Sequence, residues 1–525
     1  CAVWDVDPEA TSIGFEDYLG TIQADFLDCL DVLPHPELVD YLVLVRGLPY
    51  RVDLDDGSTT SLSAMLQVHQ AADSDGTALA GQGQGSSSSY WYATIDNPIH
   101  LSVFSSSACD FEVDNPYAGS YTSACKILQM SEGPSSFTRS DAGTADGFDF
   151  DGNLFVVTRL DGFDHGDALD LVERGAAADG TFPDAEILCM EGADEARAAR
   201  DPECEMVTRY LAGAGANATY LEPHDATLSG HEVAAYWSGA ADLTGAIAGN
   251  TYVPGAIVDN LTSYGAVPQN FSCDESGESC PASESQTSIA RFVRAGATGV
   301  HGTVAEPLNN SFPSAGSLLL YTMGYNLGES FLFTQPYLYW QNLVLGDPLT
   351  SPFAERPEVD LSSADGSPQD GVLTVPEGGL IRIEAFHSVG VSETRLFVDG
   401  AWVDDSACER LRWPVEGDEG DSFEVLAVAF ATNETQLNEG WPTEEILPLT
   451  DVQGWARAQV TLSAPIDGGA DDAGDDDCGE WDTGEASVEG SKGSSCGCTS
   501  SPSPSSGVLG LLAMVGMAGA RRRRP

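Results

Sequence analysis

The sequence predicts an α/β domain built on a parallel sheet, followed by an all-β sandwich of the immunoglobulin-like type. Between residues 154 and 304, short apolar runs alternate with amphipathic stretches. This is the pattern of strands joined by helices in right-handed crossovers. After Arg356-Pro357, apolar and polar residues alternate over about a hundred residues without helical stretches, which favours a sandwich. We therefore predict two domains, at residues 1–356 and 357–465.

The elements of the first domain follow from the spacing of its apolar residues. One apolar face over residues 14–33 predicts an amphipathic helix, and five consecutive apolar residues at 41–45 predict a strand buried on both faces. A region rich in Gly, Ser and Gln opens an insertion near residues 71–150. The alternating series predicts strands at 154–160, 185–190, 219–221, 233–237, 251–253 and 297–304, and helices at 165–176, 196–211 and 256–264.

The run GATGVHGTVAEP, residues 296–307, marks the last strand of this series. Apolar residues at helical spacing precede it, so Gly296 is expected to end a helix. Gly299 and Gly302 remove side chains where the backbone comes close to other groups. Glu306 lies at the carboxyl end of the strand, where open α/β sheets keep their sites.

This run and a second one, PYLYWQNLVLGDPLTSPF at residues 336–353, resemble a family of secreted bacterial proteins. That family is distantly related to the gingipain-like and caspase-like peptidases. It combines a GATG-strand-EP element with a later YLxWxxLVxGDPL element. The resemblance extends upstream through VDYLVLVRGLPYRVD, VVTRLDG and VPGAIVDNLTSYG, and so covers roughly residues 1–356. It implies a caspase-like fold rather than an activity.

Peptidases of this kind place His-Gly after the third core strand and Cys after the fourth, because the thiol needs an imidazole within reach. The corresponding positions here hold Ser238-Gly239 and Pro254-Gly255-Ala256. The resemblance therefore implies the fold without cysteine-protease activity.

Polar residues remain where the predicted strands end. The candidate catalytic carboxylates are Asp161, Glu306 and Asp259, and the candidate binding residues are Arg159, Ser238 and Asn260. In a parallel sheet all six share one edge. An arginine among carboxylates is either a structural ion-pair network or a clamp for an anionic ligand.

Three other residues have a simpler explanation than catalysis. Asp347 in GDPL is expected to cap a turn rather than bind a metal. His165 is expected at an exposed helix start, the alternative being a cation site with Asp161 and Asp164. His301 stands alone in the sequence, and no phosphate-binding loop, GxSxG or HExxH motif is present.

The charge balance excludes some partners. The chain has 82 acidic and 22 basic residues, a formal charge of -60. Such a surface repels nucleic acid and anionic lipid, so no nucleic acid partner is expected. It suits a salty or calcium-rich exterior. The run DDAGDDD lacks the ligand spacing of an EF-hand, so no cofactor is predicted, with Ca²⁺ as the remaining alternative.

Twelve cysteines in so acidic a chain indicate an oxidising exterior. Close spacing predicts the disulfides Cys109–Cys125, Cys189–Cys204 and Cys273–Cys280, although spacing alone does not fix the connectivity. Paired CxxC motifs are missing, so no structural zinc site is predicted. Cys1 is consistent with a truncated start or with a lipidated N-terminus.

The C-terminal region predicts a linker and an anchor. Residues 466–506 form an acidic Ser/Gly/Pro linker, and residues 507–525 join an apolar segment to an arginine cluster. The resemblance to a MYXO-CTERM sorting tail rests on the apolar segment together with Cys496, Cys498, Arg521, Arg522, Arg523 and Arg524. It implies a sorting protease and the membrane as partners, and anchoring at the outer surface of the cell envelope.

Two functions follow from these observations. The first is a non-catalytic surface protein that binds an extracellular partner or polymer of unidentified chemistry. The alternative is a secreted hydrolase that uses carboxylates at the carboxyl edge of the sheet, with Arg159 orienting an anionic substrate. The missing thiol and imidazole favour the first.

Overall fold

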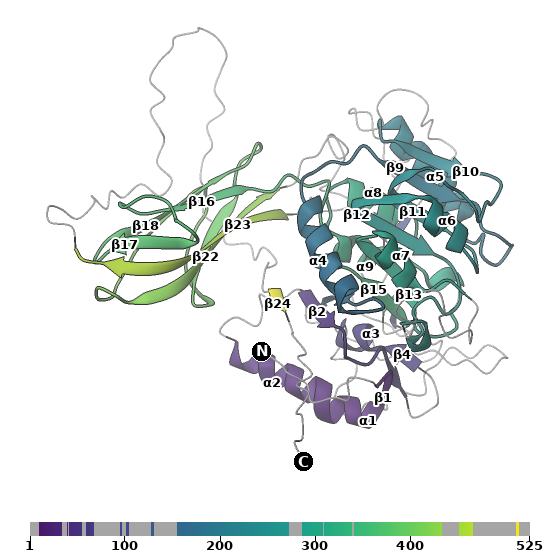
Figure 1. Cartoon of the computed structure of the whole chain (residues 1–525), viewed down its shortest axis with the longest axis horizontal. Coiled ribbons are helices and arrows are strands. Elements are labelled where there is room, and N and C mark those ends of the chain that lie inside the picture. The colour runs from purple at the N-terminus through teal and green to yellow at the C-terminus, as the bar shows by residue number, and fades with distance from the viewer. Residues whose placement is uncertain are drawn as a thin grey trace, which may run out of the picture. The chain divides into compact units, whose positions relative to one another are not determined.

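A computed structural model describes residues 10–33, 39, 41–54, 59–67, 155–271, 286–307, 309–338, 341–432 and 451–465, and the backbone of four short strands elsewhere. The chain divides into two compact units, one holding residues up to Glu355 and the other beginning at Arg356. Figure 1 shows the helices in the first unit and strands alone in the second. The change of pattern at Arg356-Pro357 coincides with this division.

The first unit is built on a nine-stranded sheet with the order β10-β9-β11-β12-β13-β15-β8-β2-β24. Its strands are β2 (Tyr41–Val45), β8 (Val156–Leu160), β9 (Glu186–Met190), β10 (Ala218–Leu221), β11 (Glu232–Ser238), β12 (Thr251–Asn260), β13 (Gly299–Thr303), β15 (Asn342–Leu345) and β24 (Leu511–Ala513). Strands β9 to β13 are parallel to one another, as are β8, β2 and β24, and β15 adjoins β8 through one register pair, Leu345 with Arg159. Since β13 and β15 are antiparallel, the sheet is mixed rather than uniformly parallel.

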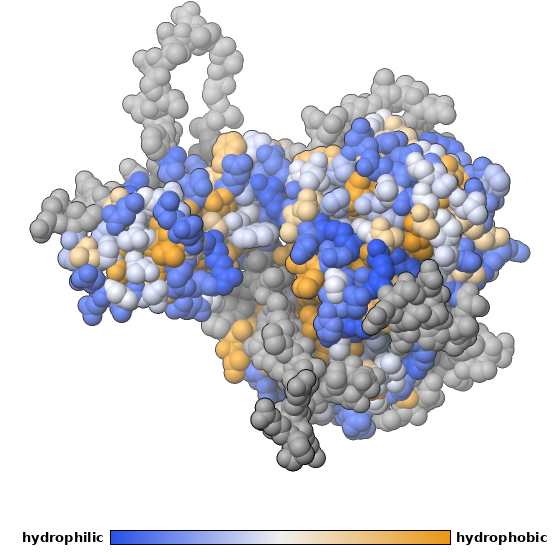
Figure 2. All heavy atoms as spheres, in the orientation of Figure 1, coloured by the Kyte–Doolittle hydropathy of each residue, from blue (hydrophilic) through white to orange (hydrophobic). Residues whose placement is uncertain are grey.

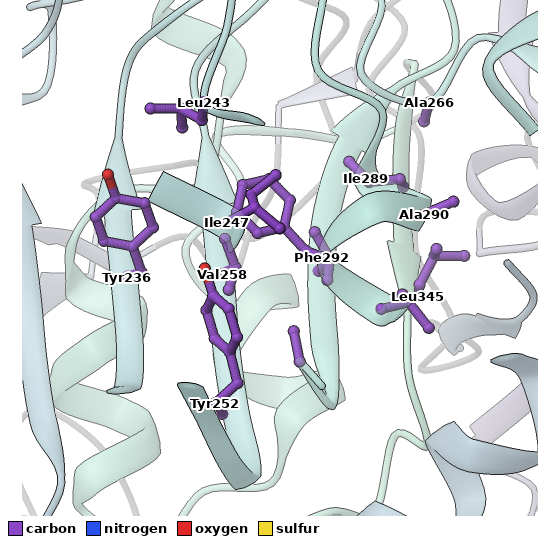
Figure 3. Close-up of a cluster of buried hydrophobic side chains, with 14 of the residues drawn as sticks. Tyr236, Leu243, Ile247, Tyr252, Val258, Ala266, Ile289, Ala290, Phe292 and Leu345 are labelled. Atoms are coloured by element: carbon purple, nitrogen blue, oxygen red, sulfur yellow. The ribbon is translucent and has the colours of Figure 1, made fainter. Parts of the chain in front are cut away.

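Helices cover both faces of this sheet. Trp237 packs with side chains of α5, α8 and α9, whereas Tyr236 packs with those of α4, α6 and α7. Successive strand residues point to opposite faces, so these clusters lie on the two sides. Figure 3 shows the second cluster, with Tyr252 and Phe292. The helices are α4 (His165–Ala178), α5 (Asp201–Gly213), α6 (Thr244–Gly249), α7 (Ile289–Ala295), α8 (Gly316–Thr322) and α9 (Leu327–Leu332).

The start of the chain adds a further layer. The predicted amphipathic helix is present as α1 (Phe15–Asp17), a π-helical segment η1 (Tyr18–Gln23) and α2 (Ala24–Val32), whose apolar face packs against β2 and β8. The smaller elements are β1 (Ser12–Gly14), β3 (Arg51–Asp53), β4 (Thr59–Ser61), α3 (Leu62–Gln67), β5 (Ile95–Asp96), β6 (Leu101–Val103), β7 (Leu128–Met130), η6 (Pro268–Phe271), η7 (Asn309–Ser311) and β14 (Tyr337–Leu338).

The predicted helix at 256–264 is wrong. Residues 251–260 form one strand of 10 residues, β12. The Pro254-Gly255 pair suggests a strand end, but Gly255 has φ +87° and lies opposite a register shift in β11. The chain therefore passes through a bulge, where proline is tolerated, and the strand continues. The predicted helix at 196–211 begins later, at Asp201, where a proline follows at once.

The glycines of the GATG run act as predicted. Gly296 ends α7 with φ +117°, which favours glycine. Gly302 lies under α7, because a Cβ atom added there would be 2.7 Å from Ile289 Cγ2 and 3.2 Å from Ala266 Cβ. The strand and helix thus approach more closely than an alanine allows.

Replacing Gly302 by Ala is expected to lower the free energy of unfolding by about 1–3 kcal/mol, because the added methyl group overpacks this contact. Urea unfolding measures the change. Gly20→Ala is the control, since no atom lies within 4 Å of a Cβ atom added at that helical position. Equal destabilisation by both changes would show that close packing at Gly302 is not the cause.

The second unit consists of two sheets around one core. The three-stranded sheet has the order β16-β18-β21 and the five-stranded sheet β17-β23-β22-β19-β20. The strands are β16 (Glu358–Ser362), β17 (Val372–Pro376), β18 (Leu380–Phe386), β19 (Glu393–Val398), β20 (Ala401–Ser406), β21 (Arg410–Pro414), β22 (Ser422–Thr432) and β23 (Asp451–Ser463). The Asp399-Gly400 pair, a sequence signal for a two-residue hairpin turn, joins β19 to β20 with positive φ at both residues.

Several predicted features lie outside the described residues. They are most of the insertion at 71–150, the linker at 466–506, the cysteine pairs Cys109–Cys125 and Cys273–Cys280, and the anchor residues Cys496, Cys498, Arg521, Arg522, Arg523 and Arg524. Of the predicted apolar tail, the backbone of β24 is described, parallel to β2. Among the helices that the structure describes, none is long and apolar enough to span a membrane.

Candidate functional site

The structure separates the six predicted site residues. Arg159 and Asp161 lie at the carboxyl end of β8, whereas Ser238, Asn260 and Glu306 lie at or beyond the carboxyl ends of β11, β12 and β13. The guanidinium of Arg159 lies over Tyr50, whose ring stacks on Phe271 beyond the carboxyl end of β12, so this group lies toward the predicted edge. The six residues do not form one cluster, because Arg159 contacts the loop after β2 whereas Arg200 joins Asp259 to Ser238.

Arg159 is part of an internal ion-pair network. Its side chain and that of Asp161 are both 0% exposed, with Nε 2.8 Å from Asp161 Oδ2. Its Nη1 and Nη2 donate to the carbonyl oxygens of Pro49 and Leu48 at 3.0 and 2.5 Å. The guanidinium also lies 4.1 Å from the ring centre of Tyr50. All three nitrogens are thus engaged within the protein, and the fully buried side chain is out of reach of an anionic substrate.

Asp161 is equally occupied. Its Oδ1 accepts hydrogen bonds from Arg46 Nη1 and from the backbone nitrogen of Gly162, both at 2.8 Å. Burial, together with the negative charge of Asp161, raises the pKa of Tyr50 above its ordinary value. This predicted catalytic carboxylate is therefore a structural anchor for the turn after β2.

Asp259 lies beside His301, a histidine with no partner residue recognisable in the sequence. The registers of β9, β11, β12, β13 and β15 place one transverse row on a single face, made of Cys189, Trp237, Asp259, His301 and Val344. In this row Asp259 Oδ2 lies 3.2 Å from His301 Nδ1, and both side chains are 0% exposed. His301 Nε2 lies 2.9 Å from Asn342 Oδ1. Only strand register could have revealed this pair.

Arg200, at the start of α5, completes this group, which we call the Asp259 cluster (Arg200, Asp259, His301 and Asn342). Arg200 Nη1 lies 3.0 Å from Asp259 Oδ2, and Nη2 donates to the backbone oxygen of Ser238 at 3.1 Å. Sequence analysis missed Arg200, because an arginine before a helix carries no signal of burial. The cluster links α5 to three strands.

The surroundings of the Asp259 cluster are aromatic. The ring of His301 lies edge-on to Phe312 and stacks against Phe331 at centroid distances of 5.2 and 6.1 Å. A buried Asp-His pair prepares an imidazole for base catalysis when Nε2 faces a hydroxyl or thiol. Here Nε2 faces the amide of Asn342. The geometry thus fits a rigid polar core better than a nucleophile and its base.

The carboxyl edge of β11 to β13 retains one partly exposed candidate. Glu306 Oε1 accepts a hydrogen bond from Ser263 Oγ at 2.9 Å, and the next residue, Tyr264, has φ +64°. Asn260 instead uses its side-chain amide to bind both backbone groups of Ala240, each at 2.9 Å. Asn260 therefore holds the loop after β11, and Glu306 is the predicted carboxylate that still reaches the surface.

Asp347 and the start of α4 have the structural roles expected of them. Asp347 Oδ1 accepts from the backbone nitrogen of Leu349 at 3.0 Å, so this residue caps its turn. His165 is exposed at the start of α4, next to the helix-capping Asp164. Because Asp161 is paired with arginines, the alternative cation site is not formed. Among the described residues, no group of three or more His, Cys, Asp or Glu could hold a metal ion.

Replacing Asp164 by Ala is expected to lower the free energy of unfolding by about 1 kcal/mol at neutral pH, because the helix loses its cap. Hydrogen bonds from the first backbone amides of α4 lower the pKa of Asp164, with a smaller contribution from Arg294. A carboxyl whose pKa is lower in the folded state stabilises the fold above its unfolded pKa of about 3.9. This stabilisation is lost as pH falls through the folded pKa.

Urea unfolding of wild type and variant between neutral pH and pH ~2 measures the effect. The two proteins should converge in acid, whereas a constant difference would contradict the assignment. Asp170→Ala is the control, since Asp170 is exposed on the same helix and pairs only with Arg174 among the described ion pairs.

The predicted disulfide Cys189–Cys204 is confirmed. It joins β9 to α5 with a Cα–Cα distance of 5.7 Å and a sequence separation of 15. Both cysteines are buried beside Trp237 in the core on the α5 side of the sheet. The bond therefore ties the helix that carries Arg200 to the sheet that carries Asp259.

Comparison of the chain with protein-family models and with curated proteins gives no match. Among solved structures, fibronectin(III)-like modules of Clostridium thermocellum CbhA match at 14% identity, over 21% of this chain and 100% of theirs, with a TM-score of 0.13. A CARDB domain from Pyrococcus furiosus, described with di-metal ions, matches at 10% identity, over 21% of this chain and 96% of its own, also with a TM-score of 0.13. At this TM-score neither likeness supports a functional argument.

Proposed function

We propose that the protein is exported, anchored at the outer surface of the cell envelope by its C-terminal tail, and binds an extracellular partner or polymer without catalysing a reaction. The observation that supports this proposal is the burial of two candidate catalytic carboxylates and their pairing with arginines. Asp161 and Asp259 are 0% exposed and paired with arginines, so they serve the fold. A general acid or base must instead reach its substrate.

We also propose that the first unit is a caspase-like or gingipain-like domain without the dyad, and that the second is immunoglobulin-like. Motif order supports the first part. Two sheets around one core, antiparallel except for the parallel pair β17 and β23, support the second. Since β12 extends to Asn260, the position for a thiol moves from Pro254-Gly255-Ala256 to Leu261-Thr262. This position also carries no cysteine, and Ser238-Gly239 still follows β11.

Export is supported by cysteine chemistry. Cys189 and Cys204 form a buried disulfide, and Cys29 and Cys408 are also disulfide-bonded. Disulfides persist in oxidising compartments and are rare in the cytosol. The charge of -60 agrees with a protein kept soluble outside the cell.

The catalytic question is tested by incubating the full chain with peptide, ester and glycan libraries. We expect no turnover. Turnover that is abolished by Glu306→Gln or by Asp161→Asn, while unfolding is unchanged, would overturn the proposal. Glu205→Gln is the matched control, because Glu205 is exposed on α5 and pairs with Arg209.

One observation keeps a hydrolase as the second candidate. Glu306 is partly exposed at the carboxyl edge of β13 and contacts the hydroxyl of Ser263. If turnover is found, Glu306→Gln should remove it and Asp161→Asn should act through stability alone, because only Glu306 reaches the surface.

Anchoring is tested by fractionating cells that express the chain with and without residues 507–525. The complete chain is expected in the envelope fraction and the shortened chain in the medium. Finding both in the cytosol would remove the surface assignment.

A further inference from the structure

The outer face of the five-stranded sheet in the second unit carries a strip that sequence analysis did not detect. Residues paired across antiparallel strands share a face. Leu396, Val425 and Ala458 lie in the core, so the residues that alternate with them point outward. Two outward rows cross the sheet, one of Asp405, Arg395, Val428 and Trp455 and the other of Trp402, Phe397, Leu426 and Arg457.

Most apolar members of these rows reach the surface. Trp455 is 49% exposed, Trp402, Phe397 and Leu426 are partly exposed, and Val428 is buried. Neighbouring strands lie about 4.8 Å apart, so four strands present a strip roughly 14 Å wide. Figure 2 shows apolar residues among hydrophilic ones on the visible surface of this unit.

Arginines hold the aromatic side chains in place. The guanidinium of Arg395 lies 4.9 Å from the ring centre of Trp402 and 4.7 Å from that of Phe430. Arg356 lies 5.3 Å from the ring centre of Trp455. Such cation–π contacts fix the rings before any ligand binds, which lowers the entropic cost of binding.

The two arginines of the strip are paired with carboxylates. Arg395 donates to both carboxylate oxygens of Glu393, at 2.5 and 2.8 Å, and Arg457 pairs with Glu424. These pairs leave polar groups at the surface. They also interrupt the apolar area of the strip. The strip therefore differs from the core of a protein–protein interface, which is depleted of charged residues.

We propose that this outer face, formed by Trp402, Phe397, Leu426 and Trp455 and flanked by Arg457 and Gln459, binds a neutral polysaccharide. The apolar faces of sugar rings stack on exposed aromatic rings, and the flanking polar groups hydrogen-bond sugar hydroxyls. The charge of -60 repels acidic polymers. This inference rests on the proposed binding function and names the class of polymer.

The test uses the full chain and four neutral glycans, namely cellulose, mixed-linkage β-glucan, xylan and amylose, with polygalacturonate as the acidic comparison. Pull-down and calorimetry should show binding to at least one neutral glycan and none to polygalacturonate. Trp455→Ala is expected to weaken that binding at least tenfold. Tryptophan fluorescence of the wild-type chain should change on binding, which gives a readout that needs no variant.

Phe386→Ala is the matched control, because Phe386 is 67% exposed and lies on β18 of the other sheet. It should bind like the wild type. Failure to bind all four glycans, or full binding by the double variant Trp455→Ala/Trp402→Ala, would overturn this inference while leaving the non-catalytic proposal intact. Conversely, release of sugars from a bound glycan would overturn the non-catalytic proposal but would leave the proposed glycan-binding face intact.

Discussion

Replacing Asp259 by Asn is expected to lower the free energy of unfolding by about 3–5 kcal/mol, because it removes one partner of a buried ion pair. The side chains of Asp259 and His301 are 0% exposed, and that of Arg200 is 9% exposed. Without the carboxylate, Arg200 keeps its charge inside the protein, where it still donates to the carbonyl oxygens of Pro313 and Ser238. Urea unfolding at neutral pH measures the loss.

Asp194→Asn is the matched control for this prediction. Asp194 also pairs with an arginine, since its Oδ2 lies 2.5 Å from Arg197 Nη1, but its side chain is 48% exposed. An exposed pair contributes less than about 1 kcal/mol, because water screens the charges. Similar losses for both variants would contradict the argument that burial makes the Asp259 cluster strong. If the Asp259→Asn variant binds glycan like the wild type at low temperature, then Asp259 acts in folding alone.

Removing the disulfide with Cys189→Ala and Cys204→Ala together is expected to lower the free energy of unfolding by about 3 kcal/mol. A bond that closes a loop of this length restricts the unfolded chain by roughly that amount. The sequence separation is 15, and both sulfur atoms lie in a core cluster. Denaturant unfolding of the wild type and the double variant measures the difference under oxidising conditions.

The same comparison under reducing conditions is the control. Dithiothreitol opens the bond in the wild type and has nothing to open at these positions in the variant, so the difference between the two should disappear. Any loss common to both proteins then reports the other disulfides, those of Cys29 and Cys408 among them. A difference that survives reduction would mean that packing of the substituted side chains, rather than the covalent bond, carries the effect.

Local sequence signals predicted most of the individual elements. The five apolar residues at 41–45 form a strand, and the apolar face over 14–33 forms the N-terminal helical segment. The helix predicted at 165–176 is α4, and the hairpin turn lies at Asp399-Gly400. These signals act within a few residues, so they depend little on the tertiary context. The helix predicted at 256–264 failed because Pro254-Gly255 has the local signal of a strand end, whereas pairing with β11 and β13 carries the chain through a bulge.

The candidate site was harder to predict from local sequence signals than the secondary structure was. Asp161, Asp259 and Asn260 were selected correctly as unusual polar residues, yet the structure gives each an internal partner. Arg200 and Asn342, which complete the Asp259 cluster, carry no sequence signal. The aromatic strip was also missed, because its members come from four strands and no two of them are close in sequence except Phe397 and Trp402.

The sequence by itself determined the kind of most elements, the face of a strand that is buried, and the turn between β19 and β20, and it indicated the pairing of Cys189 with Cys204. Only the tertiary structure decided that β15 runs against β13, that His301 lies beside Asp259, and that Trp455 shares a face with Trp402. The physical reason is that periodicity specifies an element and its buried side, whereas strand direction and register depend on packing between residues that are distant in the chain.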